Sequence, residues 1–150
     1  MINFKTIIRI IGILLLLETV MLLACSAISY YYNDEALLDF WKSAGITAGA
    51  GLLMAIAGKG GEKQLTRRDG YVLVSLAWVA FSLFGMLPFY ISGYVPDITN
   101  AFFETMSGFT STGATVLDNI ESLPHGLLFW RGMTQWIGGL GIIMFTIAVL

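Results

Sequence analysis

The sequence contains little charge, one cysteine and one histidine. Only 12% of its 150 residues are charged, against about 25% in a typical soluble domain. The eight Lys and Arg residues form no basic stripe, which argues against a nucleic-acid partner. Cys25 lies in an apolar run, permits no intrachain disulfide and is interpreted as a packing residue. His125 has no second His or Cys nearby, so a metal site built on it is not expected.

Apolar residues dominate instead. They make up 57% of the chain, and the mean hydropathy is +0.78, which indicates an integral membrane protein. Four apolar runs predict spans at residues 6–30, 40–57, 71–91 and 127–150. The second run contains Gly45, Gly49 and Gly51, which would let a neighbouring helix approach closely. Pro88 is expected to kink or end the third span. Because the last run ends without a polar tail, we expect the chain to be the first part of a longer protein.

The basic residues predict the orientation of the spans. Six of the eight cations precede the first span or lie between the second and third: Lys5, Arg9, Lys59, Lys63, Arg67 and Arg68. These two regions share one side after two crossings, and the positive-inside rule assigns that side to the cytoplasm. We therefore expect a cytoplasmic N-terminus, a two-helix hairpin at residues 1–58, a cytoplasmic linker at 59–70 and a further unit at 71–150.

The segment FFETMSGFTSTGATVL, residues 102–117, is apolar enough to lie at membrane depth. It is too short to cross a bilayer, since a spanning helix needs about 20 apolar residues. Asp97 offers an N-cap, so a short helix is predicted at residues 98–109. The hydroxyl and small residues around Gly113 can hold extended backbone, whose carbonyls can replace the hydration shell of potassium. The pattern therefore favours a re-entrant pore loop, with an external amphipathic loop at the membrane interface as the alternative.

Two intramembrane charges also call for an explanation. Arg131 shares a helical face with Gln135 and is expected either to brace the pore loop through Glu104 or to anchor near the headgroups by snorkelling; we favour the brace. Glu18 lies in the middle of the first span. A structural hydrogen bond to another helix is the favoured interpretation, and a proton relay is the alternative.

An enzymatic function is not expected from this sequence. A membrane protease would need Ser107 or Ser111 activated by His125. No nucleophile elbow and no intramembrane histidine support that arrangement.

The segment 102–117, followed by HGLLFWRGMTQWIGGLGIIMF, closely resembles the first pore-loop repeat of the TrkH-type subunit of the Trk/Ktr/HKT cation transporters. The resemblance covers essentially the whole chain. It implies an all-α membrane protein in which a two-helix hairpin precedes one helix–pore loop–helix repeat of a potassium-channel-like fold. Four such repeats would each supply one filter segment with a single glycine, here Gly113. Ser111, Thr112, Gly113 and Ala114 would turn their carbonyls toward potassium, with the ion bound at the first three, and Thr115 would close the outer end.

The resemblance also implies potassium transport across the bacterial inner membrane. It implies a homodimer of full-length chains, surrounded by lipid and regulated by a cytosolic nucleotide-binding TrkA-like subunit. Potassium would be the bound ion, with no covalently bound cofactor. A non-conducting membrane scaffold or assembly fragment is the alternative. The residues leave open potassium against sodium selectivity, and channel-like conduction against symport with protons or sodium.

Overall fold

The computed structural model describes residues 3–60 and 66–149, and the regular structure within these residues is entirely helical. Residues 61–65 of the predicted linker and Leu150 of the predicted fourth span lie outside the described residues. The helices are α1 (Phe4–Tyr31), α2 (Leu37–Ala57), α3 (Arg67–Gly85), α4 (Leu87–Ile91), α5 (Ile98–Phe109), a 3-10 turn (Ile120–Ser122) and α6 (His125–Val149).

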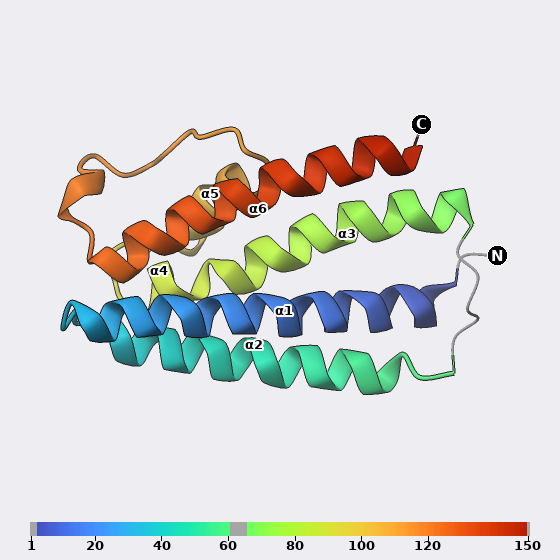
Figure 1. Ribbon diagram of the computed structural model, residues 1–150, viewed down its shortest axis with the longest axis horizontal. Helices are drawn as coiled ribbons and strands as arrows, with labels where there is room; N and C mark the ends of the chain where they lie inside the picture. The colour runs from blue at the N-terminus through green and yellow to red at the C-terminus, as the bar shows by residue number, and fades with distance from the viewer. Residues whose placement is uncertain (1–2, 61–65, 150) are drawn as a thin grey trace.

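Four long helices lie side by side, and the short helices α4 and α5 sit toward one end of them (Figure 1). Within the described residues, three stretches are long and apolar enough to cross a membrane: Phe4–Tyr31, Leu37–Ala57 and Arg68–Ile91, which joins α3 to α4. The predicted fourth span corresponds to α6, a helix of 25 residues. The fold is therefore that of a multi-pass helical bundle.

Helices α1 and α2 approach each other backbone to backbone. A Cβ atom on Gly12 would lie 2.5 Å from the Ala55 nitrogen, and one on Gly51 would lie 2.9 Å from the Gly12 carbonyl oxygen. Small residues allow such contacts between helices in a membrane. The predicted close approach is confirmed at Gly51, whereas Gly45 and Gly49 meet nothing within 4 Å among the described residues.

A break separates α3 from α4. Helix α3 ends at Gly85, and Pro88 opens α4, where its missing N–H interrupts the helical hydrogen-bond ladder as predicted. The Trp130 indole of α6 donates to the Gly85 carbonyl at 2.9 Å. This bond satisfies a backbone group at the break and ties α6 to it.

Helix α5 forms where the sequence predicts it. The Asp97 carboxylate accepts the Asn100 amide at 2.9 Å, which is the predicted N-cap. Ala101, Thr105 and Phe109 of α5 are fully buried, and Phe109 belongs to the same apolar cluster as Trp130 of α6. Helix α5 is thereby held against α3 and α6, and its C-terminal end is fixed in position.

Candidate functional site

The chain turns sharply after α5 and runs back along α6 as a non-helical stretch, residues 110–119, here called the return segment (Figure 1). Ser111 and Gly113 have positive φ angles of 55° and 77°. Glycine adopts such angles freely, but a serine pays about 1 kcal/mol. The Ser111 hydroxyl donates to the Gln135 carbonyl of α6 at 2.9 Å, which offsets this cost and attaches the turn to α6.

Ser107 holds the turn from both sides. Its carbonyl accepts the Thr112 amide at 2.9 Å and the Gly113 amide at 3.4 Å. Its hydroxyl donates to the Ala114 carbonyl at 2.6 Å. The sequence analysis considered Ser107 only as a nucleophile. In the structure, its hydrogen bond to the Ala114 carbonyl holds the start of the return segment against α5.

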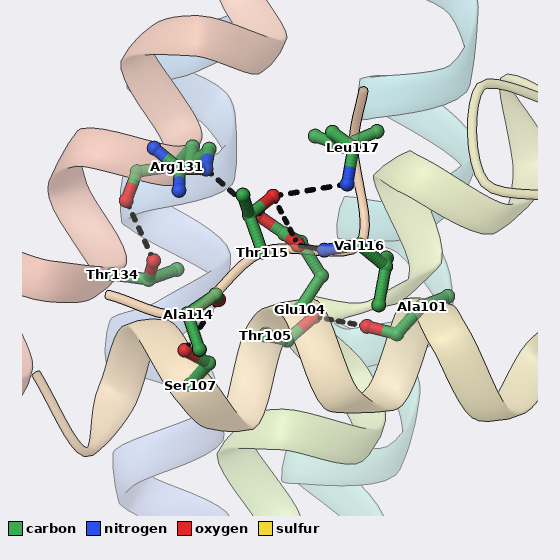
Figure 2. A network of polar contacts seen from close by, with 10 residues as sticks. All are labelled: Ala101, Glu104, Thr105, Ser107, Ala114, Thr115, Val116, Leu117, Arg131 and Thr134. Carbon is green, nitrogen blue, oxygen red and sulfur yellow. Dashed lines mark hydrogen bonds and ion pairs between the residues drawn. The ribbon is translucent and has the colours of Figure 1, made fainter. Parts of the chain in front are cut away.

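Glu104 connects α5, α6 and the return segment (Figure 2). One carboxylate oxygen accepts the Arg131 Nε at 2.7 Å. The other accepts the Thr115 hydroxyl at 2.8 Å and the Val116 amide at 3.0 Å. Glu104 is 3% exposed, and a buried carboxylate is tolerated when it is paired and hydrogen-bonded in this way. The predicted contact between Arg131 and Glu104 is confirmed.

The C-terminal end of α5 is enclosed by α3 and α6. The Trp78 indole of α3 donates to the Phe109 carbonyl at 3.2 Å. Gly138 of α6 lies against the same carbonyl, so closely that a Cβ atom there would overlap the oxygen. Gly108 of α5 lies just as closely against the Thr134 hydroxyl of α6, so a Cβ atom on Gly108 would overlap that oxygen. Gly138 therefore lets α6 touch the start of the turn.

The predicted filter residues lie together on the exposed side of this assembly. Residues 111–116 are all exposed. Within the described residues, the carbonyls of Ser111, Thr112 and Gly113 accept no hydrogen bond. The Ala114 carbonyl differs, because it accepts the Ser107 hydroxyl. The Thr115 side chain is turned toward Glu104. The backbone therefore offers three consecutive carbonyl oxygens to a ligand. Such an arrangement suits a cation, which carbonyl dipoles can bind.

His125 lies at the start of α6 and contacts the loop between α1 and α2. Its Nδ1 is 3.4 Å from Asp34, and its ring stacks on Tyr32 with centroids 4.1 Å apart. The other Asp34 oxygen accepts the Gly126 amide at 3.0 Å. The Ser107 and Ser111 hydroxyls donate to backbone carbonyls instead. The structure therefore does not bring His125 together with either serine.

The expected hydrogen bond of Glu18 is not formed. Glu18 is buried, but neither carboxyl oxygen has a hydrogen-bond partner among the described residues. The neighbouring α3 presents Gly85 to Glu18 Oε1, and glycine has no side chain that could donate a hydrogen bond.

Comparison with known proteins agrees with this architecture. Residues 40–150 match the TrkH family, described as a cation transport protein. The Trk system potassium uptake proteins TrkH of Halomonas elongata and of Escherichia coli strain K12 are each 37% identical to this chain over 99% of its length. The crystal structure of the potassium transporter TrkH from Vibrio parahaemolyticus superposes with a TM-score of 0.92 at 37% identity, covering 99% of this chain.

The chain spans about a third of these relatives: 31% of the Halomonas and Escherichia proteins and 32% of the Vibrio structure. The family match covers α3, α4, α5, the return segment and α6, together with most of α2. This chain therefore belongs to the TrkH family of cation transport proteins.

Proposed function

We propose that this chain provides one of four selectivity-filter segments of a potassium transport protein. Helix α5 and the return segment form the re-entrant pore loop, and the carbonyls of Ser111, Thr112 and Gly113 bind potassium as cargo. The observation that carries the proposal is that these three residues are exposed and their carbonyls accept no hydrogen bond from the residues that the structure describes, on a backbone held by Ser107, Glu104 and α6. The relatives named as potassium uptake proteins supply the choice of ion.

The mechanism is the exchange of water for fixed carbonyl dipoles. Potassium loses its hydration shell at the mouth of the filter, binds the carbonyl oxygens and moves down its electrochemical gradient. Ala114 contributes as well, because a carbonyl oxygen has a second lone pair beyond the one that accepts the Ser107 hydroxyl. Thr115 closes the outer end of the filter. Helix α5 directs its partly negative C-terminus toward the ion, which favours a cation.

Membership of the family supports the following proposal for the rest of the assembly. Three further repeats in a longer chain complete the filter, and two such chains form a homodimer in the bacterial inner membrane. The N-terminus and the basic linker at 59–70 face the cytoplasm, where a nucleotide-binding TrkA-like subunit docks. The hairpin at 1–58 packs outside the pore-loop repeat at 71–150. Arg131 and Glu104 are structural supports of the filter and do not contact the ion.

Rubidium uptake by the intact protein tests the proposal, with the Gly113→Ser variant compared with wild type. A serine at φ 77° is strained wherever it occurs, so a matched control is needed. Gly93→Ser provides it, since Gly93 has φ 78°, meets nothing within 4 Å and lies in the loop after α4. We expect Gly113→Ser to lose uptake or the preference for potassium over sodium while Gly93→Ser keeps both. Equal behaviour of the two variants would contradict the filter assignment, and absence of uptake by wild type would favour a scaffold.

A further inference from the structure

Glu18 occupies a position that the fold otherwise reserves for apolar side chains. The buried face of α1 includes Ile11, Leu15, Leu22 and Cys25, and Glu18 lies on the same face, three or four residues from its neighbours. Glu18 is only 1% exposed. The described residues of this chain cover both carboxyl oxygens.

One carboxyl oxygen, Glu18 Oε1, lies next to Gly85 at the end of α3. A Cβ atom on Gly85 would lie 2.8 Å from Glu18 Oε1, 2.9 Å from the Thr105 methyl group and 3.0 Å from the Phe109 ring. These three side chains therefore meet at Gly85, where α3 ends. The Thr105 hydroxyl is turned away and donates to Ala101 of its own helix at 2.8 Å. Both Glu18 oxygens remain without a hydrogen bond among the described residues.

Among the described residues, no charged group of the helices around Glu18 pairs with it. On α5, Glu104 pairs with Arg131 of α6. On α2, Asp39 pairs with Lys42, and at the start of α6, His125 contacts Asp34. The remaining titratable side chains of α1 and α3 that the structure describes form no hydrogen bond to Glu18: Lys5, Arg9, Cys25, Tyr30, Tyr31, Arg68, Asp69 and Tyr71. An ionised Glu18 would be an unpaired buried charge, which is among the costliest groups to place inside a protein or a membrane.

A metal ion does not fit this site. Hard cations need six or more oxygen ligands, and Glu18 brings only its own two. The described residues contain no group of three side chains able to hold a metal. A proton is the ligand that matches one carboxyl group among apolar neighbours.

We propose that Glu18 is a proton-binding site that joins α1 to the break between α3 and α4. The neutral carboxyl packs against Gly85, Thr105 and Phe109, and its ionisation loosens this contact. The site lies beside Thr105 and Phe109 of α5, and it does not depend on the filter assignment. The contact between Glu18 of α1 and the end of α3 would therefore respond to pH.

Infrared spectroscopy of the intact protein tests the charge of Glu18 directly. At neutral pH, we expect wild type to show a carbonyl band of a protonated carboxylic acid that is absent from the Glu18→Gln variant. Glu121→Gln is the matched control, because Glu121 is exposed in the turn before α6 and its replacement should leave that band unchanged. A band of equal intensity in wild type and Glu18→Gln would overturn the proposal.

Stability as a function of pH gives a second measurement, with Glu18→Met as the comparison. Methionine is similar in size and brings no donor, so this variant should fold at least as well as wild type. Binding of a proton by Glu18 in the folded state would couple the folding equilibrium to pH. The folding constant of wild type should therefore fall by up to about tenfold per pH unit relative to Glu18→Met. Parallel pH profiles, or failure of both Glu18→Gln and Glu18→Met to fold, would show that the carboxylate is charged and needed, and would overturn the proposal.

Discussion

The Glu104 carboxylate and the Arg131 guanidinium meet at 2.7 Å between α5 and α6, and the same carboxylate binds the backbone of the return segment at Val116. One buried ion pair thus joins the two helices and the turn that they enclose. The pair neutralises both charges inside the protein, where either charge alone would be expensive.

Removing one partner of this pair should destabilise the protein strongly. Arg131→Met leaves the Glu104 charge buried and unpaired, and we expect a loss of about 3 to 5 kcal/mol. Adding Glu104→Gln removes that charge while its amide oxygen can still accept from Val116, so the double variant should recover part of the loss. A double-mutant cycle on thermal or denaturant unfolding measures the coupling, expected at about 1 to 3 kcal/mol.

The exposed pair Lys42–Asp39 is the control for this cycle. Its Lys42 side chain is 61% exposed, and its N–O distance is 3.3 Å. An exposed pair of this kind couples by less than about 1 kcal/mol. Coupling of similar size at the two sites would contradict a structural role for Glu104 and Arg131.

Ser107→Ala should alter ion preference more than stability. The change removes the hydroxyl that donates to the Ala114 carbonyl, at a cost of about 1 kcal/mol. The Ala114 carbonyl then loses its fixed direction next to the proposed binding carbonyls, so competition between sodium and rubidium uptake should shift toward sodium. Ser75→Ala is the control, because the Ser75 hydroxyl donates to Tyr71 within exposed α3. If Ser107→Ala keeps the wild-type preference between sodium and rubidium, the Ser107–Ala114 hydrogen bond does not contribute to ion selection.

Gly138→Ala should destabilise the contact between α5 and α6. The added methyl group would overlap the Phe109 carbonyl, and such overpacking costs about 1 to 3 kcal/mol. Gly141→Ala, one turn further along the same helix, meets nothing within 4 Å and should be neutral or slightly stabilising, by up to about 1 kcal/mol. Thermal unfolding compares the two. Equal midpoints would mean that α6 does not touch the turn as described.

The helices could be predicted from sequence because their signals are local. The apolar runs predicted at 6–30 and 40–57 became Phe4–Tyr31 and Leu37–Ala57, and the Asp97 cap marked the start of α5 at Ile98. Pro88 likewise marked the end of α3, since a missing N–H acts on the adjacent turn. Each of these signals requires only a few neighbouring residues.

The contacts of the site could be predicted only in part. The Glu104–Arg131 pair followed from the scarcity of charge, because few partners exist at that depth. The double role of Ser107 and the Trp78 bond to Phe109 depend on a turn and on a helix 31 residues away, which no local pattern encodes. For Glu18 the sequence predicted a partner, whereas the neighbouring helix presents Gly85.

The attachments of the return segment also have a mechanical consequence. Ser111 is bonded to Gln135, and Thr115 and Val116 are linked through Glu104 to Arg131, so both ends of the turn are fastened to positions one helical turn apart on α6. A segment that is attached to one helix at two points cannot rotate about either contact alone. Any sliding or tilting of α6 therefore moves residues 111–116 as one piece, and a force applied at the far end of α6 reaches the carbonyls without an intervening joint.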